Sequence, residues 1–169
     1  MAADRRVPAW VPATSLVLCV AGVAVAGYLT YEHYSASTTL SCPSTGTIDC
    51  LKVTTSTYSK VFGIPVALLG LLYFIAITPL CLPVAWRSPV NAVHGLRAVA
   101  SLAGVAFVCY LVWAELFRID AICLWCTGVH IITVLLFFVV CFGTALLGSP
   151  DASDMAVLDI KEPEHGSRP

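Results

Sequence analysis

Two pairs of cysteines have the residue type and spacing that suit thiol–disulfide chemistry. Cys42 and Cys50 are separated by seven residues, and Cys123 and Cys126 form a Cys-Leu-Trp-Cys motif. When a Cys-x-x-Cys opens a helix, its first sulfur faces free backbone N–H groups. These groups lower the pKa of that thiol and make it a better attacking or leaving group. The second pair is therefore suited to an exchangeable disulfide.

The segment between Cys42 and Cys50 begins with Pro-Ser-Thr-Gly at 43–46, residues that favour turns. We expect a mobile loop whose disulfide accepts electrons from a soluble thiol protein and passes them to the other pair by thiol–disulfide exchange. Two alternatives stay open: a purely structural loop disulfide, and a zinc site made of all four thiols. The loose spacing of the loop pair favours redox chemistry over zinc, so no metal site is predicted.

The elements that must position these cysteines are membrane-spanning helices. The chain has 169 residues, of which 59% are hydrophobic and 11% charged, and its mean hydropathy is +0.88. Crossing the hydrocarbon of a bilayer takes roughly 20 apolar residues per helix. Four apolar runs approach that length: 12–31, 64–86, 98–114 and 122–147. Lipid offers the backbone no hydrogen-bond partner, so each run must be helical, and the predicted fold is an all-α bundle of four transmembrane helices.

The third run is the weakest of the four. Arg97 opens it, and Glu115 and Arg118 close it early. We expect it to reach full length by extending these side chains toward the membrane interfaces. Glu115 and Arg118 are then interface charges, spaced i, i+3 for an ion pair.

The predicted topology has both termini on one side of the membrane and the loops 35–63 and 117–121 on the other. The basic residues are Arg5, Arg6, Arg87 and Arg97 on the terminal side, and Lys52, Lys60 and Arg118 on the loop side. This small excess favours a cytoplasmic location for the termini. Dithiols that cycle through disulfides belong on the oxidising face, and they place the two loops outside the cytoplasm. The predicted location is the plasma (inner) membrane.

The chain reads as one domain with polar ends. We expect a cytoplasmic N-terminus over 1–11, a transmembrane domain over 12–147 with the cysteine-bearing loop at 35–63, and a disordered cytoplasmic tail over 148–169. The net charge of −1 gives no indication of nucleic-acid binding. Haem ligands, iron–sulfur ligands and a Gly-rich dinucleotide motif are not apparent in the sequence. By exclusion, the electron acceptor that suits a membrane dithiol is a lipid-soluble quinone.

Several segments together resemble the vitamin K epoxide reductase family, and its bacterial members most closely. The segments are Cys42-x7-Cys50, 51–56, 58–70 with its Phe-Gly-Ile-Pro, and Cys123-Leu-Trp-Cys126. The resemblance covers about 12–147. It implies a four-helix bundle around a quinone of the menaquinone or ubiquinone type, with the loop between the first two helices folded over it as a lid.

The resemblance also implies a role for each cysteine. Cys126 is the thiolate next to the quinone ring, and Cys123 forms a transient mixed disulfide with Cys50. Cys42 exchanges with a thioredoxin-like partner outside the cytoplasm. Many bacterial members carry that partner as a fused domain; this chain does not, so a separate partner is expected here.

The chain departs from the vertebrate enzymes at two positions associated with the quinone carbonyls. His130 stands where they have tyrosine, and Ser59 where they have asparagine. Both are candidate quinone-binding residues, together with Phe62 and Trp125. The departures put epoxide reduction in doubt without affecting the thiol relay.

The predicted function is a quinone-dependent thiol–disulfide oxidoreductase that supports disulfide formation. The alternatives are a vitamin K quinone or epoxide reductase of the eukaryotic type, and a non-enzymatic tetraspan scaffold with a structural disulfide or zinc site.

Overall fold

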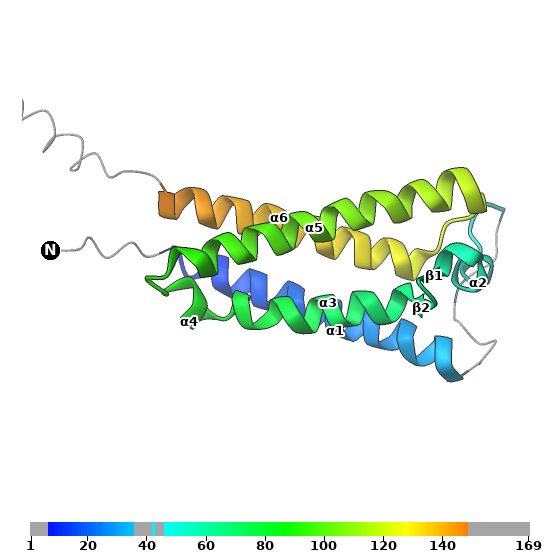
Figure 1. Ribbon diagram of the computed structural model, residues 1–169, viewed down its shortest axis with the longest axis horizontal. Helices are drawn as coiled ribbons and strands as arrows, with labels where there is room; N and C mark the ends of the chain where they lie inside the picture. Colours follow the sequence, from blue (N-terminus) through cyan, green and yellow to red (C-terminus); the bar gives the residue numbers. More distant parts are fainter. Residues whose placement is uncertain (1–6, 36–41, 43–45, 149–169) are drawn as a thin grey trace, which may run out of the picture.

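The computed structural model describes residues 7–35, 42 and 46–148, and these are mostly helical. The four longest helices are α1 (Trp10–Ser35), α3 (Val66–Cys81), α5 (Asn91–Ala114) and α6 (Leu124–Gly148). They lie side by side along the long axis of the molecule (Figure 1). The shorter elements are α2 (Cys50–Thr55), the 3₁₀ turn η1 (Thr57–Ser59), strands β1 (Lys60–Val61) and β2 (Ile64–Pro65), α4 (Pro83–Trp86) and the π-helical turn η2 (Glu115–Ile119).

Three of these helices are long and apolar enough to cross a bilayer: α1, α5 continued through η2, and α6. The protein is thus an all-α membrane protein, as its composition predicts. The expected domain limits at 1–11 and 148–169 fall mostly outside the described residues, although α1 already begins at Trp10 and α6 ends at Gly148.

The second apolar run, 64–86, is not one continuous helix. Helix α3 has 16 residues and ends at Cys81, and Leu82 adopts an extended backbone with φ −61° and ψ 147°. Pro83 accounts for the break, because its ring disfavours a helical conformation in the residue before it. Pro83 then takes the first position of α4, where a missing N–H costs nothing.

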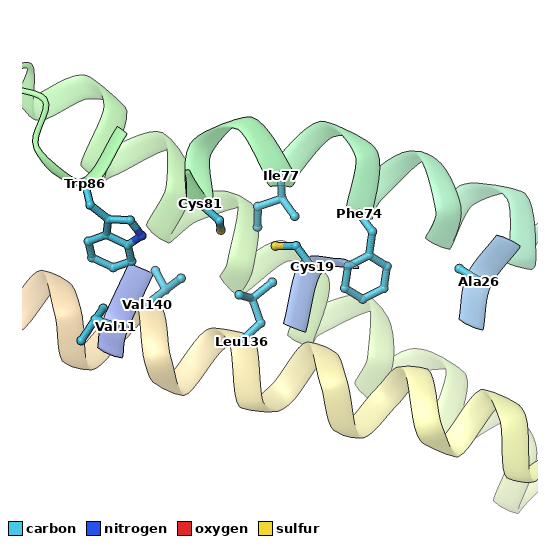
Figure 2. Packing of buried hydrophobic residues seen from close by; sticks show 9 residues of the cluster. All are labelled: Val11, Cys19, Ala26, Phe74, Ile77, Cys81, Trp86, Leu136 and Val140. Carbon is cyan, nitrogen blue, oxygen red and sulfur yellow. The ribbon is translucent and has the colours of Figure 1, made fainter. Parts of the chain in front are cut away.

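The core lies between α1, α3 and α6 toward the end of the bundle that holds α4 (Figure 2). Its buried members are Val11, Cys19, Ala26, Phe74, Ile77, Cys81, Trp86, Leu136 and Val140. Gly22 permits the close contact of α1 with α3, since a methyl group there would collide with the ring of Phe74.

Arg97 is buried in this region, which corrects the expectation that it extends toward the membrane interface. Its side chain is fully buried. The guanidinium lies 3.4 Å from the ring centroid of Trp86, donates to the Leu80 carbonyl at 3.0 Å and hydrogen-bonds to His94 at 2.8 Å. Contact with an aromatic face and the free carbonyls near the end of α3 compensates the buried cation locally. The cation therefore ties α5 to α3 and α4.

At the opposite end of the bundle, α2 and a short hairpin connect α1 to α3 (Figure 1). Strands β1 and β2 pair antiparallel, with Val61 opposite Ile64. The two residues between them, Phe62 and Gly63, have φ of 51° and 82°. Positive φ at both positions is typical of a tight hairpin turn, and glycine adopts it without strain.

Candidate active site

The loop before α2 is joined to the loop before α6 by backbone hydrogen bonds. Ile122 donates to the Thr47 carbonyl at 2.9 Å, and Asp49 donates to the Ile122 carbonyl at 3.1 Å. These bonds form a parallel bridge between Ile48 and Ile122. Each joined segment directly precedes a cysteine, so the bridge brings Cys50 and Cys123 to the same place.

Helix α2 begins at Cys50 because Asp49 caps it. The carboxylate of Asp49 accepts a hydrogen bond from the backbone N–H of Lys52 at 2.9 Å, as an N-cap residue does. The Lys52 ammonium group donates in turn to the carbonyl of Asp120, at 3.2 Å, in the loop before α6. The cap and this contact hold Cys50 at the first position of a short helix packed on η2.

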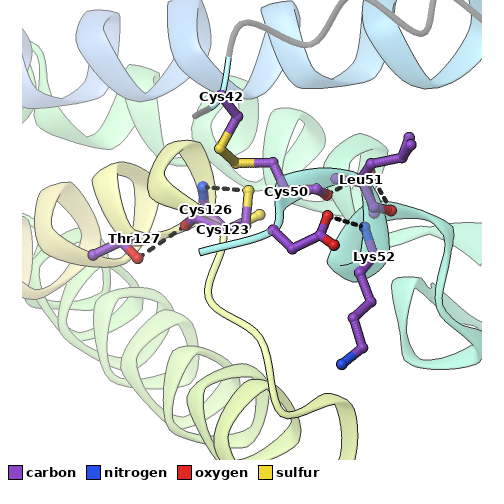
Figure 3. The surroundings of a disulfide bond; sticks show 9 residues. Cys42, Cys50, Leu51, Lys52, Cys123, Cys126 and Thr127 are labelled. Atoms are coloured by element: carbon purple, nitrogen blue, oxygen red, sulfur yellow. Dashed lines mark hydrogen bonds between the residues drawn. A yellow bond between two sulfur atoms is a disulfide. The ribbon is translucent and has the colours of Figure 1, made fainter. Parts of the chain in front are cut away.

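The four predicted catalytic cysteines lie together (Figure 3). Cys42 and Cys50 form a disulfide, with Cα atoms 6.1 Å apart, whereas Cys123 and Cys126 are free thiols. Cys50 and Cys123 belong to one buried cluster, against which Cys42 and Cys126 pack. Thiol–disulfide exchange needs the attacking sulfur and the disulfide in contact, and the cluster provides that proximity.

Cys123 stands immediately before α6 and acts as its cap. Its sulfur accepts a hydrogen bond from the backbone N–H of Cys126 at 3.4 Å, and its carbonyl accepts the N–H of Thr127 at 2.8 Å. The pKa of the Cys123 thiol is lowered, chiefly because the Cys126 thiol donates a hydrogen bond to it, although burial acts in the opposite direction. A stabilised thiolate at this position is a good leaving group in exchange.

Cys126 lies on the wall of a cavity of about 750 Å³. Residues of all four long helices and of α2 line this cavity, and most of the lining is apolar. Cys123 does not line it. The two thiols therefore differ in access: Cys123 faces the loop disulfide, and Cys126 faces the cavity.

A few polar side chains break the apolar lining. His130 and Ser59 lie on the cavity wall, as does Tyr73. The Tyr73 hydroxyl is buried and has no hydrogen-bond partner within the described part of the chain. An apolar cavity with a few inward polar groups is typical of a small-molecule site. An unpartnered hydroxyl there fits a ligand that brings its own carbonyl oxygen, as a quinone does.

The structure places the four predicted quinone-binding residues differently. Ser59 and His130 line the cavity, and His130 lies one turn beyond Cys126 on α6. Phe62 is 100% exposed at the hairpin turn and is not part of the lining. Trp125 packs against the cysteine cluster, with its ring 4.8 Å from that of Tyr28, and is also outside the lining.

Sequence reasoning missed two cavity residues. Tyr73 lies within an apolar run and gives no local signal of a site. Glu115, interpreted as an interface charge paired with Arg118, is only 6% exposed and lines the cavity. Arg118 instead lies over the ring of Trp113, 5.2 Å from its centroid. A charged residue near the end of an apolar run was the available signal for Glu115.

The helices and paired cysteines define a membrane protein of the thiol oxidoreductase class. Comparison with protein families matches residues 13–141 to the vitamin K epoxide reductase family, and the chain belongs to that family. This membership agrees with the resemblance in its cysteine motifs and establishes a multi-pass membrane oxidoreductase of thiol and quinone chemistry. A comparison with curated proteins finds no match.

Proposed function

We propose that the protein oxidises a thioredoxin-like partner outside the cytoplasm and passes the electrons to a membrane quinone. The electrons enter at Cys42/Cys50 and leave through Cys123/Cys126. The observation that carries the proposal is the burial of Cys50 and Cys123 in one cluster, held by the backbone bridge between 47–49 and 122. A merely structural loop disulfide would not need that contact with a second, free dithiol.

The relay is a sequence of exchanges that conserves electrons. A thiolate of the partner attacks Cys42, which breaks the Cys42–Cys50 bond and releases Cys50 as a thiolate; the partner's second thiol then releases Cys42. Cys50 attacks Cys123 in an oxidised Cys123–Cys126 pair, and Cys126 leaves. Cys42 next attacks Cys50 and releases Cys123. The loop disulfide is restored, and the two electrons reside on Cys123 and Cys126.

The cavity beside Cys126 is the site that we assign to the quinone, of the menaquinone or ubiquinone type. A bound quinone supplies an acceptor for two electrons and two protons. Ser59, Tyr73 and His130 provide polar groups for its carbonyl oxygens. The mostly apolar lining suits the hydrophobic ring of a quinone beside Cys126. Trp125 packs against the cysteine cluster and stabilises its position. Contact between Phe62 and the quinone stays a prediction, and the full exposure of the Phe62 side chain does not support it.

For the topology, we propose that α3 completes the set of four spans, with α4 extending it to the interface. The loop 35–63 then lies on the extracytoplasmic face of the inner membrane of a bacterium, and α2 closes the cavity as a lid. Residues Leu51, Val53 and Thr54 of α2 line the cavity, which supports the lid role.

The test is quinone reduction by the purified protein in liposomes. With a small dithiol as donor, wild type is expected to reduce a short-chain quinone, and Cys123→Ser to have no activity above background. Cys109→Ser, which removes an exposed cysteine of α5, is the matched control and is expected to behave as wild type. Activity that survives in Cys123→Ser would refute the relay.

The loop pair is tested with two donors. Cys42→Ser is expected to lose electron transfer from a thioredoxin-fold partner while it retains reduction by the small dithiol. Equal rates with both donors would remove Cys42 from the route. A mixed disulfide trapped between Cys42 and the partner in a Cys50→Ser protein is expected. A zinc signal that requires all four cysteines would instead favour the structural alternative.

A further inference from the structure

Glu115 is an acidic side chain in the cavity wall that the proposed relay does not use. It is the first residue of η2 and directly follows α5. Its carbonyl accepts hydrogen bonds from the backbone of Asp120 and, at 3.3 Å, of Ala121. These bonds anchor the loop that leads to Cys123, and the side chain of the same residue lines the cavity that Cys126 also lines. Single π-helical turns are frequent at functional sites.

The carboxyl group interacts electrostatically with both thiols of the Cys-x-x-Cys motif. The pKa of Cys123 is lowered chiefly by the hydrogen bond from Cys126, and the charge of Glu115 opposes that effect. Among the described residues, Glu115 is the ionisable group outside the pair that acts on both thiols in this way.

Other titratable groups share the cavity wall: Glu32 and His33 from α1, Tyr58 and Lys60 from the segment after α2, Tyr73 from α3, and His130 from α6. Lys52 of α2 contacts the loop at Asp120, and Arg118 of η2 itself lies over Trp113. His130 stands one turn further along α6 than Cys126. Of the two carboxyl groups on the cavity wall, Glu32 and Glu115, it is Glu115 that acts electrostatically on both thiols.

We propose that Glu115 transfers protons from the Cys123/Cys126 dithiol to the quinone bound in the cavity. The inference rests on the proposed function. Oxidation of the dithiol breaks two S–H bonds and forms one S–S bond, which releases two electrons and two protons. The quinone accepts both electrons and both protons and becomes quinol. The Glu115 carboxylate takes up a proton from the pair and returns it to a quinone oxygen, so it is unchanged after each turnover.

A carboxylate in this position solves a physical problem of the buried site. The cavity wall beside Cys126 is mostly apolar, so a proton leaving this thiol meets few acceptors there, and separation of charge is costly. General acid–base groups of this kind contribute typically about 10²–10⁴-fold to a rate.

The first test compares Glu115→Gln with Asp120→Asn. The glutamine keeps size and hydrogen-bonding capacity but cannot carry a proton. Asp120→Asn removes an exposed carboxylate from the same loop, and asparagine tolerates the positive φ of that position. With a small dithiol as donor, E115Q is expected to reduce a short-chain quinone on the order of 10²-fold more slowly than wild type. D120N is expected to match wild type. The deficit of E115Q should shrink as the pH rises, because hydroxide can then remove the thiol proton.

The second readout needs no quinone. The Glu115 carboxylate opposes ionisation of the dithiol, so E115Q should react faster than wild type with an alkylating agent near neutral pH, as measured by mass spectrometry. Slower quinone reduction together with faster alkylation is the expected signature. Loosened packing alone would raise the alkylation rate at every pH, whereas loss of the carboxylate should move the pH profile of alkylation to lower pH. Equal quinone reduction in E115Q and wild type would overturn the inference, as would an unchanged alkylation profile.

The two proposals fail in different ways. If wild type does not reduce quinone at all, the proposed function fails. If wild type is active and E115Q is equally active, only the proton-transfer role fails. Should E115Q not fold, the wild-type protein labelled isotopically in its glutamate side chains answers the question. Its redox-difference infrared spectrum is expected to show a glutamate carboxyl band, and the absence of such a band would overturn the inference.

Discussion

Two pairs of hydrogen-bonded thiols lie in different parts of the molecule. Cys19 and Cys81 join α1 to α3 inside the core (Figure 2), and the Cys19 thiol donates to Cys81. Cys126 donates in the same way to Cys123 at the other end of the bundle. The pairs are alike in residue type, and three of the four thiols are buried, with Cys126 half-buried. Their surroundings therefore decide their chemistry.

The core pair is enclosed by packed hydrophobic residues, and neither of its members lines the cavity. The other pair has a disulfide on one side and the cavity on the other. Buried structural thiols are inert, whereas an exchange site needs access to a second sulfur or an acceptor. Access to reaction partners, more than solvent exposure, therefore distinguishes the reactive thiols of this protein.

The largest expected difference between the two pairs is in turnover. Cys126→Ser should lower dithiol-dependent quinone reduction roughly 10³-fold or more, since it removes an atom that takes part in the reaction. Cys81→Ala should stay within about twofold of wild type, because a buried thiol behaves as a small hydrophobic group. Initial rates of quinone reduction by purified proteins check both. If Cys81→Ala were as inactive as Cys126→Ser, the core pair could not be distinguished from the Cys123/Cys126 pair by its role in turnover.

For stability we expect the opposite: a substitution in the core should lower the free energy of unfolding and leave the activity unchanged. Trp86→Ala in the core removes a buried ring and the stacking surface of Arg97, and should cost about 3–5 kcal/mol of unfolding free energy. Activity per folded molecule should be retained. Denaturant unfolding in mixed micelles measures the cost, and Trp113→Ala, at a half-exposed tryptophan, is the control with the smaller effect. Equal losses in the two variants would contradict a core centred on Trp86.

A smaller effect is expected at the cap of α2. Asp49→Ala should destabilise this short helix by about 1 kcal/mol, because the Lys52 N–H loses its acceptor. Asp49→Asn, which caps equally well, is the control. Faster hydrogen exchange at 50–55 in the alanine variant alone is the expected result. Unchanged exchange would mean that the disulfide and the bridge to Ile122 hold α2 without the cap.

The subtlest difference concerns ionisation. The pKa of Cys123 is lowered mainly by the hydrogen bond from Cys126, so its thiolate should persist to lower pH than that of an ordinary cysteine. Replacing Cys126 with alanine removes this donor and should move the alkylation profile of Cys123 to higher pH. Iodoacetamide labelling across pH, followed by mass spectrometry, measures the shift. A profile that moves to lower pH would show that another group stabilises the thiolate.

Much of the fold was accessible from hydropathy, because a membrane helix is defined by a local run of apolar residues. The helical membrane class and the three long spans followed from it. The break at Pro83 was not predicted, although the proline itself is the cause. Arg97 was placed wrongly for a different reason. Its partners, Trp86 and the Leu80 carbonyl, lie on other elements, and a linear sequence does not show which aromatic face a cation will meet.

For the site, the residue types can be read from the sequence: two cysteine pairs, one of them at the start of a helix. The folded structure is needed to see that Cys50 lies against Cys123, that Cys126 faces a cavity, and that Glu115 and Tyr73 line the same cavity. The physical reason is that thiol chemistry and helix capping are local properties, whereas contact between sulfurs depends on a backbone bridge between loops far apart in the chain. The cavity likewise exists only where the packed helices leave space.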